Sequence, residues 1–412
     1  MPSAVVTGIG VRTPGGNGLE EFWHTLTSGR TVTRPISFFD AGEFRSRAAG
    51  ECDFDAEAEG LTRREVRRMD RATQFAVACA RDAIADSGLD LDRLDPHRTG
   101  VSLGTALGSI NSLEREYVVL SDGGRERVVD PAYASPHLYD YLTPSTAAVE
   151  VAWTVRAEGP VSLVTDGCTA GLDAVGQALR IIRDGAADVV VAGATEAAVT
   201  PIVVACFDAI RATSTQGRCR PFDRARDGIV LAEGAAVLVI ESDEHARRRG
   251  ARVYAELSGF ATRFNAFHMT GLTPEGPELA EAVRAALADA RADVDDIDYV
   301  NAHGTGTAQN DRHETAAIKA SLLDRARRIP VSSIKSMIGH SLGAVGSIEL
   351  AACALVLDRG VVPPTANLHD PDPDCDLDYV PLTAREHRVG TLVSVGSGFG
   401  GFQSAAVLRR PS

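Results

Sequence analysis

The chain has 412 residues, of which 44% are hydrophobic and 24% charged, a composition typical of a globular protein that can bury a sizeable core. The formal net charge of −14 argues against nucleic acid or an anionic membrane as a main partner. Its seven scattered cysteines include no CxxC pair, which favours reduced thiols in a cytoplasm over a disulfide framework or a zinc cluster.

The N-terminal residues carry neither a basic segment nor a long apolar one, so we expect no secretory signal peptide. The longest apolar stretch, near 189–207, is interrupted by Glu196 and Pro201, which argues against a membrane span. The sequence therefore predicts a cytoplasmic protein.

Short apolar segments alternate with helical patterns along the whole chain, which predicts an α/β fold. A first series of strands is expected at 5–8, 100–106, 161–165, 188–193 and 234–240. A second series is expected at 253–260, 297–301, 331–336, 392–395 and 404–408. Between strands of the second series, segment 278–290 places Leu279, Val283 and Leu287 on one helix face.

The two series indicate a duplication, with an N-terminal half at 1–250 and a C-terminal half at 251–412. The glycine-rich segments 167–176 and 339–346 each follow a predicted strand and open a predicted helix. If a pseudo-twofold axis relates the halves, Cys168 and His340 face one centre from equivalent helix N-termini.

Cys168 ends an apolar run and begins a helix. Unpaired backbone N–H groups and the positive end of the helix dipole favour a thiolate there. The alternative is a small buried hydrophobic residue, which is the role of most free cysteines.

Three more polar side chains lie at strand ends: His303 in a glycine-rich loop after strand 297–301, and Lys335 and His340 within 333–343. Singly, each has an ordinary interpretation, since histidines often only hydrogen-bond and lysines at strand ends reach solvent. No carboxylate or third histidine at helical spacing completes a metal site with the two histidines, so we expect no metal. Together with the thiol, these residues favour catalysis.

These motifs resemble those of β-ketoacyl synthases of the thiolase superfamily along essentially the whole chain. The matching motifs are Asp-Gly-Cys-Thr-Ala-Gly around Cys168, His-Gly-Thr-Gly-Thr from His303, and Lys-Ser-Met-Ile-Gly-His-Ser-Leu-Gly-Ala, which contains His340. Within the family, the chain is most similar to the ketosynthase alpha subunit of bacterial type II polyketide synthases that make aromatic polyketides. That similarity rests on segments 12–18, 113–117, 201–213, 310–315, 375–380 and 398–404.

The resemblance implies a duplicated thiolase-like fold, layered α-β-α-β-α with two mixed five-stranded sheets. It also implies a decarboxylative Claisen condensation of a malonyl thioester with an acyl chain held on Cys168. Neutral His303 and His340 would stabilise the enolate, and the backbone N–H groups of Cys168 and Phe399 would form the oxyanion site. Lys335, paired with Glu314, would keep the histidines oriented, although a purely structural ion pair is the alternative.

Further site residues follow from the same resemblance. Thr305 and Thr307 are expected to hydrogen-bond a phosphopantetheine arm, although loop hydroxyls that cap the backbone are the alternative. Phe399 and Gly400 are expected to form a gate for the acyl chain. No bound cofactor is implied, because the substrates are carried on the phosphopantetheine of an acyl carrier protein.

Two protein partners are implied. Retention of Cys168 identifies the chain as the catalytic member of a heterodimer with a chain-length factor, with strand 161–165 pairing across the interface. An acidic acyl carrier protein is expected to dock on basic residues, namely Arg67 and Arg68 with Arg211. The basic stripe Arg63, Arg64, Arg67, Arg68 and Arg71 has a solvated helix face as its ordinary interpretation.

The chain departs from the family pattern at Asp166, where threonine is typical. A carboxylate so near Cys168 would oppose a thiolate, so we expect it to point away or to be paired. The segment 214–223 is also shorter than in most relatives. The alternative functions are a homodimeric fatty-acid-type 3-oxoacyl synthase, a less favoured thiolase, and a non-catalytic scaffold that binds carrier protein.

Overall fold

The computed structural model describes residues 3–126 and 129–411. Its centre is an eleven-stranded mixed sheet in the order β11-β10-β14-β15-β9-β1-β8-β7-β5-β6, with β2 (Gly16–Asn17) attached to β1. The N-terminal half supplies β1 (Ala4–Thr13), β5 (Thr99–Gly104), β6 (Val161–Val164), β7 (Val189–Ala197) and β8 (Glu233–Ser242). The C-terminal half supplies β9 (Ala255–Phe264), β10 (Tyr299–Asn301), β11 (Val331–Ser332), β14 (Thr391–Gly398) and β15 (Phe402–Arg409). Two small ribbons pair β3 (Arg34–Pro35) with β4 (Ala48–Ala49), and β12 (Val361–Val362) with β13 (Arg385–Glu386).

Each half contributes five strands of the main path, as expected, but the two sets are not separate sheets. The first residues of β1 pair antiparallel with β9, with Ala4 opposite Leu257 and Val6 opposite Ala255. The other edge of β1 pairs with β8 along most of its length. The expectation of two sheets is corrected because β1 is hydrogen-bonded on both edges and joins them.

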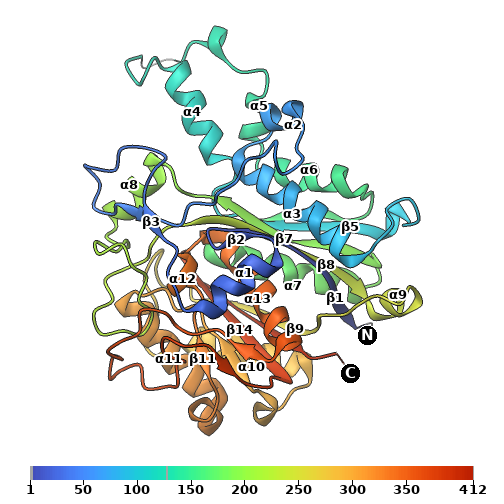
Figure 1. Ribbon diagram of the computed structural model, residues 1–412, viewed down its shortest axis with the longest axis vertical. Helices are drawn as coiled ribbons and strands as arrows, with labels where there is room; N and C mark the ends of the chain where they lie inside the picture. Colours follow the sequence, from blue (N-terminus) through green and yellow to red (C-terminus); the bar gives the residue numbers. More distant parts are fainter. Residues whose placement is uncertain (1–2, 127–128, 412) are drawn as a thin grey trace.

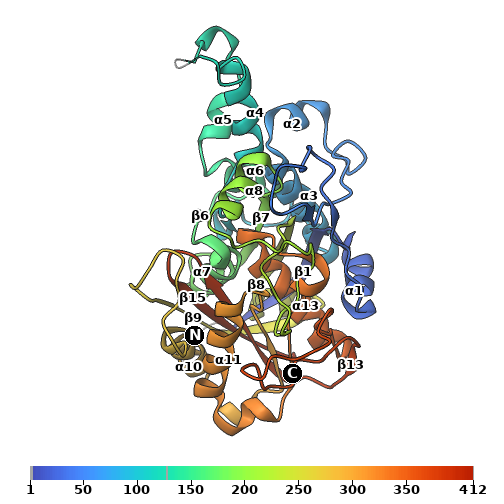
Figure 2. The ribbon, with the colours of Figure 1, turned by 90° about the vertical axis from the view of Figure 1, so that its left-hand side faces the viewer.

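Helices form three layers around this sheet, as Figures 1 and 2 show. One outer layer contains α3 (Arg71–Ser87) and α6 (Thr146–Val155), and the other contains α10 (Pro277–Ala290) and α11 (Ala308–Leu322). Between them, α7 (Ala170–Arg183) and α13 (Val345–Arg359) contact strands of both halves. The two series of strands in the continuous sheet form the two β layers on either side of α7 and α13, with α3 and α10 on their outer faces, so the predicted α-β-α-β-α layering is confirmed.

The two glycine-rich segments meet at the start of the central helices. A Cβ on Gly171 would lie 2.7 Å from the backbone nitrogen of Ser347, and a Cβ on Gly346 would lie 2.6 Å from that of Leu172. Only glycine permits this approach, which brings the N-termini of α7 and α13 together.

The predicted strand at 331–336 is much shorter than expected. Segment 331–336 is extended only over β11, and Lys335 begins the short helix α12 (Lys335–Ile338). The Ser336 hydroxyl donates to the Ser333 carbonyl (2.8 Å) and accepts from the Ala366 N–H (2.8 Å). Such local side-chain hydrogen bonds compete with a strand ladder.

The remaining helices lie at the periphery. They are α1 (Leu19–Ser28), α2 (Arg63–Arg68), α4 (Ile110–Leu120), α5 (Leu138–Leu142), α8 (Pro201–Ala209) and α9 (Asp243–Arg248). The segment with α4 and α5 projects from the body at the top of Figure 1. Within the described residues, every helix is too short or too polar to cross a bilayer.

Candidate active site

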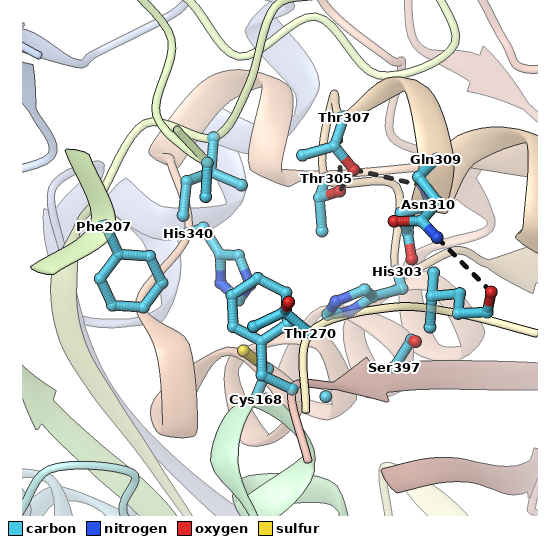
Figure 3. Close-up of a pocket in the computed structure, with 15 residues that line it drawn as sticks. Cys168, Phe207, Thr270, His303, Thr305, Thr307, Gln309, Asn310, His340 and Ser397 are labelled. Atoms are coloured by element: carbon cyan, nitrogen blue, oxygen red, sulfur yellow. Dashed lines mark hydrogen bonds between the residues drawn. The ribbon is translucent and has the colours of Figure 1, made fainter. Parts of the chain in front are cut away.

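One pocket gathers the predicted nucleophile, both predicted catalytic histidines and three more of the residues that the sequence singled out (Figure 3). Cys168 lies in the short turn η3 (Gly167–Thr169) ahead of α7, His303 follows β10, and His340 precedes the turn η6 (Leu342–Ala344) and α13. All three side chains line the pocket, together with Thr305, Thr307, Phe207 and Phe399.

The two imidazole rings lie edge to face, with centroids 5.3 Å apart and planes at 85°. Nδ1 of His340 accepts the Leu342 N–H at 3.2 Å. A neutral His340 therefore carries its proton on Nε2. Its backbone is fixed by hydrogen bonds to Val230 and Ala232 on the neighbouring segment.

Lys335 is fully buried behind the histidines. Its ammonium donates to the His303 carbonyl at 2.5 Å and forms an ion pair with Glu349 of α13. The expected pairing with Glu314 is therefore wrong, because α13 presents Glu349 to the ammonium instead. Burial, and then the Lys335 charge, hold the pKa of His303 and of His340 well below the usual range, so both rings are neutral.

Glu314 supports the site in another way. Its carboxyl oxygens accept the backbone N–H groups of His303 (2.5 Å) and Gly304 (2.7 Å). Burial raises the pKa of Glu314 to about 8. Glu314 thus fixes the backbone that carries His303.

The expectation of a thiolate at Cys168 is not met. Burial raises the pKa of the Cys168 thiol to about 11, although the Lys335 charge and the Phe399 N–H, which faces the sulfur, act in the opposite direction. Desolvation outweighs the start of the helix because the sulfur is enclosed at the base of the pocket. The thiol is the resting form.

The Phe399 loop, residues 398–401, covers the pocket next to Cys168. The ring of Phe399 stacks on Phe207, with centroids 6.2 Å apart and planes at 20°. Gly400 has φ of 93° and donates its N–H to the Met269 carbonyl at 2.6 Å, so this N–H is not directed at the sulfur. The structure thus places Phe399 at the pocket and Gly400 behind it.

Thr305 and Thr307 line the opposite wall of the pocket (Figure 3). Their hydroxyl oxygens are 3.0 Å apart, and Thr307 also accepts the Asn310 N–H at the start of α11. The Thr305 hydroxyl accepts the Thr307 N–H at 3.4 Å, so the capping role considered for these hydroxyls is present for both residues. Both residues remain part of the pocket surface.

The basic stripe on and after α2 is mostly engaged in ion pairs. Arg68 binds Glu150 at 2.6 Å and lies over Trp153, and Arg71 binds the buried Glu233 at 2.6 Å. Arg67 is exposed. Arg211 is also exposed, and it lines a cleft that shares Thr270, Thr307, Gln309 and Phe399 with the pocket around Cys168.

No group of three or more His, Cys, Asp and Glu side chains is arranged to hold a metal ion within residues 3–126 and 129–411.

Two family models match the chain. The β-ketoacyl synthase N-terminal domain matches residues 1–246, and the β-ketoacyl synthase C-terminal domain matches residues 254–369. The chain belongs to the β-ketoacyl synthase family. It is a condensing enzyme of the acyltransferase class.

Similar sequences of this ketosynthase family come from polyketide producers. The granaticin polyketide putative β-ketoacyl synthase 1 of Streptomyces violaceoruber is 66% identical over 99% of this chain and 98% of its own length. The tetracenomycin polyketide synthase ketoacyl synthase alpha subunit of Streptomyces glaucescens is 62% identical over 99% and 97%.

Solved structures agree on the fold. A ketosynthase bound to a hexaketide, in complex with its type II acyl-carrier protein, matches with a TM-score of 0.93 and 38% identity over the whole of both chains. The ishigamide ketosynthase/chain length factor matches with a TM-score of 0.92 and 35% identity, again over both chains.

Several residues of this ketosynthase site were not anticipated, and three of them contribute to its charge or its walls. Glu349 is a lone carboxylate among buried apolar residues of α13. A single acidic residue in such an apolar run was the sequence feature that could have indicated a buried ion pair. Glu196 interrupts the apolar run of β7 in the same manner and accepts N–H groups from two loops. Phe207 gave no signal, because nothing in the sequence places α8 against the Phe399 loop.

Proposed function

We propose that this chain is the condensing subunit of a type II polyketide synthase. It joins a malonyl unit on an acyl carrier protein to a chain held on Cys168, and the product is an aromatic polyketide. The observation that carries this proposal is the meeting of one thiol and two neutral imidazoles in a single pocket. Relatives that are 57–66% identical along nearly the whole chain support the polyketide assignment.

In the first step, the Cys168 sulfur attacks the thioester carbonyl of the carried acyl chain. The new C–S bond forms as the bond to the pantetheine sulfur breaks, and the thiol proton passes to the departing pantetheine thiolate. The Phe399 N–H, which faces the sulfur, and the Cys168 N–H stabilise the oxyanion of this step. A thiol that is protonated at rest avoids an isolated buried charge.

In the second step, malonyl thioester loses CO2 and the electron pair moves to its thioester oxygen. Neutral His303 and His340 donate N–H groups to that developing oxyanion. The enolate carbon then attacks the Cys168 thioester, a C–C bond forms, and the cysteine sulfur leaves as a thiolate that takes a proton from water to restore the thiol. Lys335 acts through the imidazoles as a positioning residue, since its charge opposes their protonation.

The substrates arrive on a carrier protein and require no bound cofactor. The phosphopantetheine arm runs along the wall formed by Thr305 and Thr307, and the Phe399 loop moves as the acyl chain enters. The acidic carrier protein docks near Arg211, in the cleft that adjoins the pocket around Cys168. Arg67 and Arg68 provide further contacts.

A chain-length factor completes the enzyme as a heterodimer. β6 is the last strand of the sheet path, and Val161 on it is 43% exposed, so an edge is available for a partner strand. We also propose a division into halves at 1–250 and 251–412, between α9 and β9.

The test is reconstitution of the chain with its partner subunit, a carrier protein and malonyl-CoA, followed by mass spectrometry. We expect an acyl adduct on Cys168, and we expect polyketide only when the partner is present. Cys168→Ala should lose both adduct and product, whereas Cys206→Ala, a matched change at an exposed thiol, should retain them.

Two outcomes would favour the other functions. Condensation by the chain alone, as a homodimer, would favour the fatty-acid type. Carrier-protein binding without acylation or decarboxylation would favour the scaffold.

A further inference from the structure

A second cavity lies apart from the pocket around Cys168 and shares no lining residue with it. Its volume is about 520 Å³, and it opens between the β3–β4 ribbon and the loop after α8, at the left of Figure 1. Arg30, Arg34 and Arg218 line this arginine cavity, and most of its other side chains carry a hydroxyl or an amide. A polar cavity lined by three guanidinium groups is unexpected in a chain with a formal net charge of −14.

One wall of the arginine cavity comes from the shortened segment 214–223. Gly217 has φ of 67°, and a Cβ on it would lie 2.9 Å from the Cβ of Ala48 on β4, so glycine lets this turn pack directly on the ribbon. The Asp227 carboxylate accepts four hydrogen bonds from the first residues of the segment, at 2.6–3.3 Å. The short turn is therefore fixed, and it places Arg218 on the cavity.

Two of the three guanidinium groups carry a charge that the protein does not neutralise. Arg30 and Arg218 are exposed, and within residues 3–126 and 129–411 no carboxylate forms an ion pair with either. Arg34 differs, because it pairs with Glu51 at 3.3 Å and with Asp53 at 2.6 Å. The unbalanced charge of the cavity thus comes from Arg30 and Arg218. A guanidinium matches the oxygens of a phosphate group with two parallel hydrogen bonds.

The same cavity also offers groups for hydrogen bonds with a ligand. Thr33 lines it, and the hydroxyl of Thr33 has no partner within the described residues. An enclosed hydroxyl without a partner is costly, and an acceptor oxygen on a ligand removes that cost. Asn367 lines the cavity as well, and its amide donates to the carbonyls of Cys219 at 2.9 Å and Ser336 at 3.0 Å. Asn367 thereby joins the shortened segment to α12.

The size of the cavity indicates the kind of ligand. Small-molecule sites have volumes of roughly 300–1,000 Å³, and this cavity lies within that range. It is far larger than one phosphate ion, and it presents two unneutralised guanidinium groups from separate segments. The enclosed Thr33 hydroxyl favours a ligand small enough to enter over an acidic protein surface that only covers the opening.

We propose that the arginine cavity is a binding site for a small molecule that carries two phosphate groups. Arg30 and Arg218 each bind phosphate oxygens, and a further oxygen of the ligand accepts the Thr33 hydroxyl. Arg34, held by its two carboxylates, forms the wall between them. The shortened segment 214–223 creates the site because it delivers Arg218 to the ribbon.

The test is isothermal titration calorimetry on the complex of the chain with its partner subunit. The probe is inorganic pyrophosphate, with sodium chloride at equal ionic strength as the reference. We expect saturable binding of one pyrophosphate per chain. Inorganic phosphate should bind more weakly, because one phosphate group cannot engage both guanidinium groups.

Variants assign the binding to this cavity. Arg30→Gln and Arg218→Gln should each weaken pyrophosphate binding about tenfold, the effect of losing one charge-assisted contact. Thr33→Val keeps the shape of the side chain without its hydroxyl and should weaken binding about threefold. Arg93→Gln removes the same charge from an exposed turn outside the cavity and should bind as the wild type does.

Two results would overturn the inference. One is the absence of saturable pyrophosphate binding, or binding that is equal in the wild type, Arg30→Gln and Arg218→Gln. The other is binding of a peptide of aspartate and glutamate, lost in these variants, without binding of pyrophosphate, which would assign a surface for an acidic protein. Since the titration uses neither acyl nor malonyl substrate, its result is independent of whether the chain catalyses condensation.

Discussion

The ring of His340 meets the ring of His303 edge to face at 5.3 Å, and both rings are held neutral by burial and by the ammonium of Lys335. A protonated imidazole in either position would repel the ammonium behind it. The arrangement therefore presents neutral N–H donors and not cations. Neutral donors suit an oxyanion that forms only during decarboxylation.

Substitution of either histidine should slow decarboxylation of the malonyl thioester much more than it changes the reactivity of the Cys168 thiol. We expect His303→Ala or His340→Ala to slow CO2 release from malonyl-carrier protein by about 10²–10³, the usual cost of one lost oxyanion donor. Iodoacetamide modification of Cys168 should change far less. The exposed His97→Ala is the control, and decarboxylation at the wild-type rate in the active-site variants would refute the assigned role.

The ion pair between Lys335 and Glu349 gives a second prediction. Lys335→Met leaves the Glu349 carboxyl buried without its partner, and we expect the free energy of unfolding to fall by about 3–5 kcal/mol. The double variant Lys335→Met/Glu349→Leu removes both charges and should lose much less. Urea unfolding compares them, and equal stability of the single and double variants would contradict the argument.

Local sequence was sufficient for part of this site. Cys168, His303 and His340 each lie in a short glycine-rich motif at the end of a strand, so their positions follow from neighbouring residues. The partner of Lys335 does not. The sequence around Lys335 does not distinguish Glu314 from Glu349 as its ion-pair partner. Which carboxylate reaches the ammonium depends on how α13 packs behind the histidines, and no local pattern encodes that packing.

The same distinction applies to the fold and to the thiol. Alternating elements predicted the layers, but the junction of the two sheets depends on a three-residue pairing between β1 and β9 that brings distant segments together. The helix-start motif favoured a thiolate at Cys168. Burial by residues remote in sequence raises its pKa instead.

Carrier-protein docking is expected to depend on Arg211 and Arg67. Arg211→Glu and Arg67→Glu should each raise the KM for carrier-protein substrate several-fold, with an effect that shrinks at high salt. Arg68 is unsuitable for this test because it pairs with the buried carboxyl of Glu150. Arg247→Glu on the distant helix α9 is the control, and an identical response of all three variants would count against a specific surface (Figure 1).

The buried carboxyl of Glu196 should make the free energy of unfolding depend on pH. This fully buried carboxyl accepts N–H groups from Ala106 (2.7 Å) and from Gly343 (3.2 Å), three residues after His340. Burial raises the pKa of Glu196 to about 8 in the folded protein, from its ordinary value of 4.5. The folded state therefore keeps a proton that the unfolded state releases between these two values.

Because the pKa of Glu196 is higher in the folded than in the unfolded protein, raising the pH destabilises the fold. Stability contributed by this proton is complete below the unfolded value and is lost as the pH rises toward 8, at roughly 1.4 kcal/mol per pH unit for one group. Glu196→Gln cannot ionise, so its free energy of unfolding should decline less steeply by about that slope. Urea unfolding from about pH 5 to about pH 8 measures it, with Glu244→Gln at an exposed position as the control. Equal slopes for Glu196→Gln and the wild type would show that Glu196 is already ionised in the folded protein, and that the loops carrying Ala106 and Gly343 are held by a charged carboxylate.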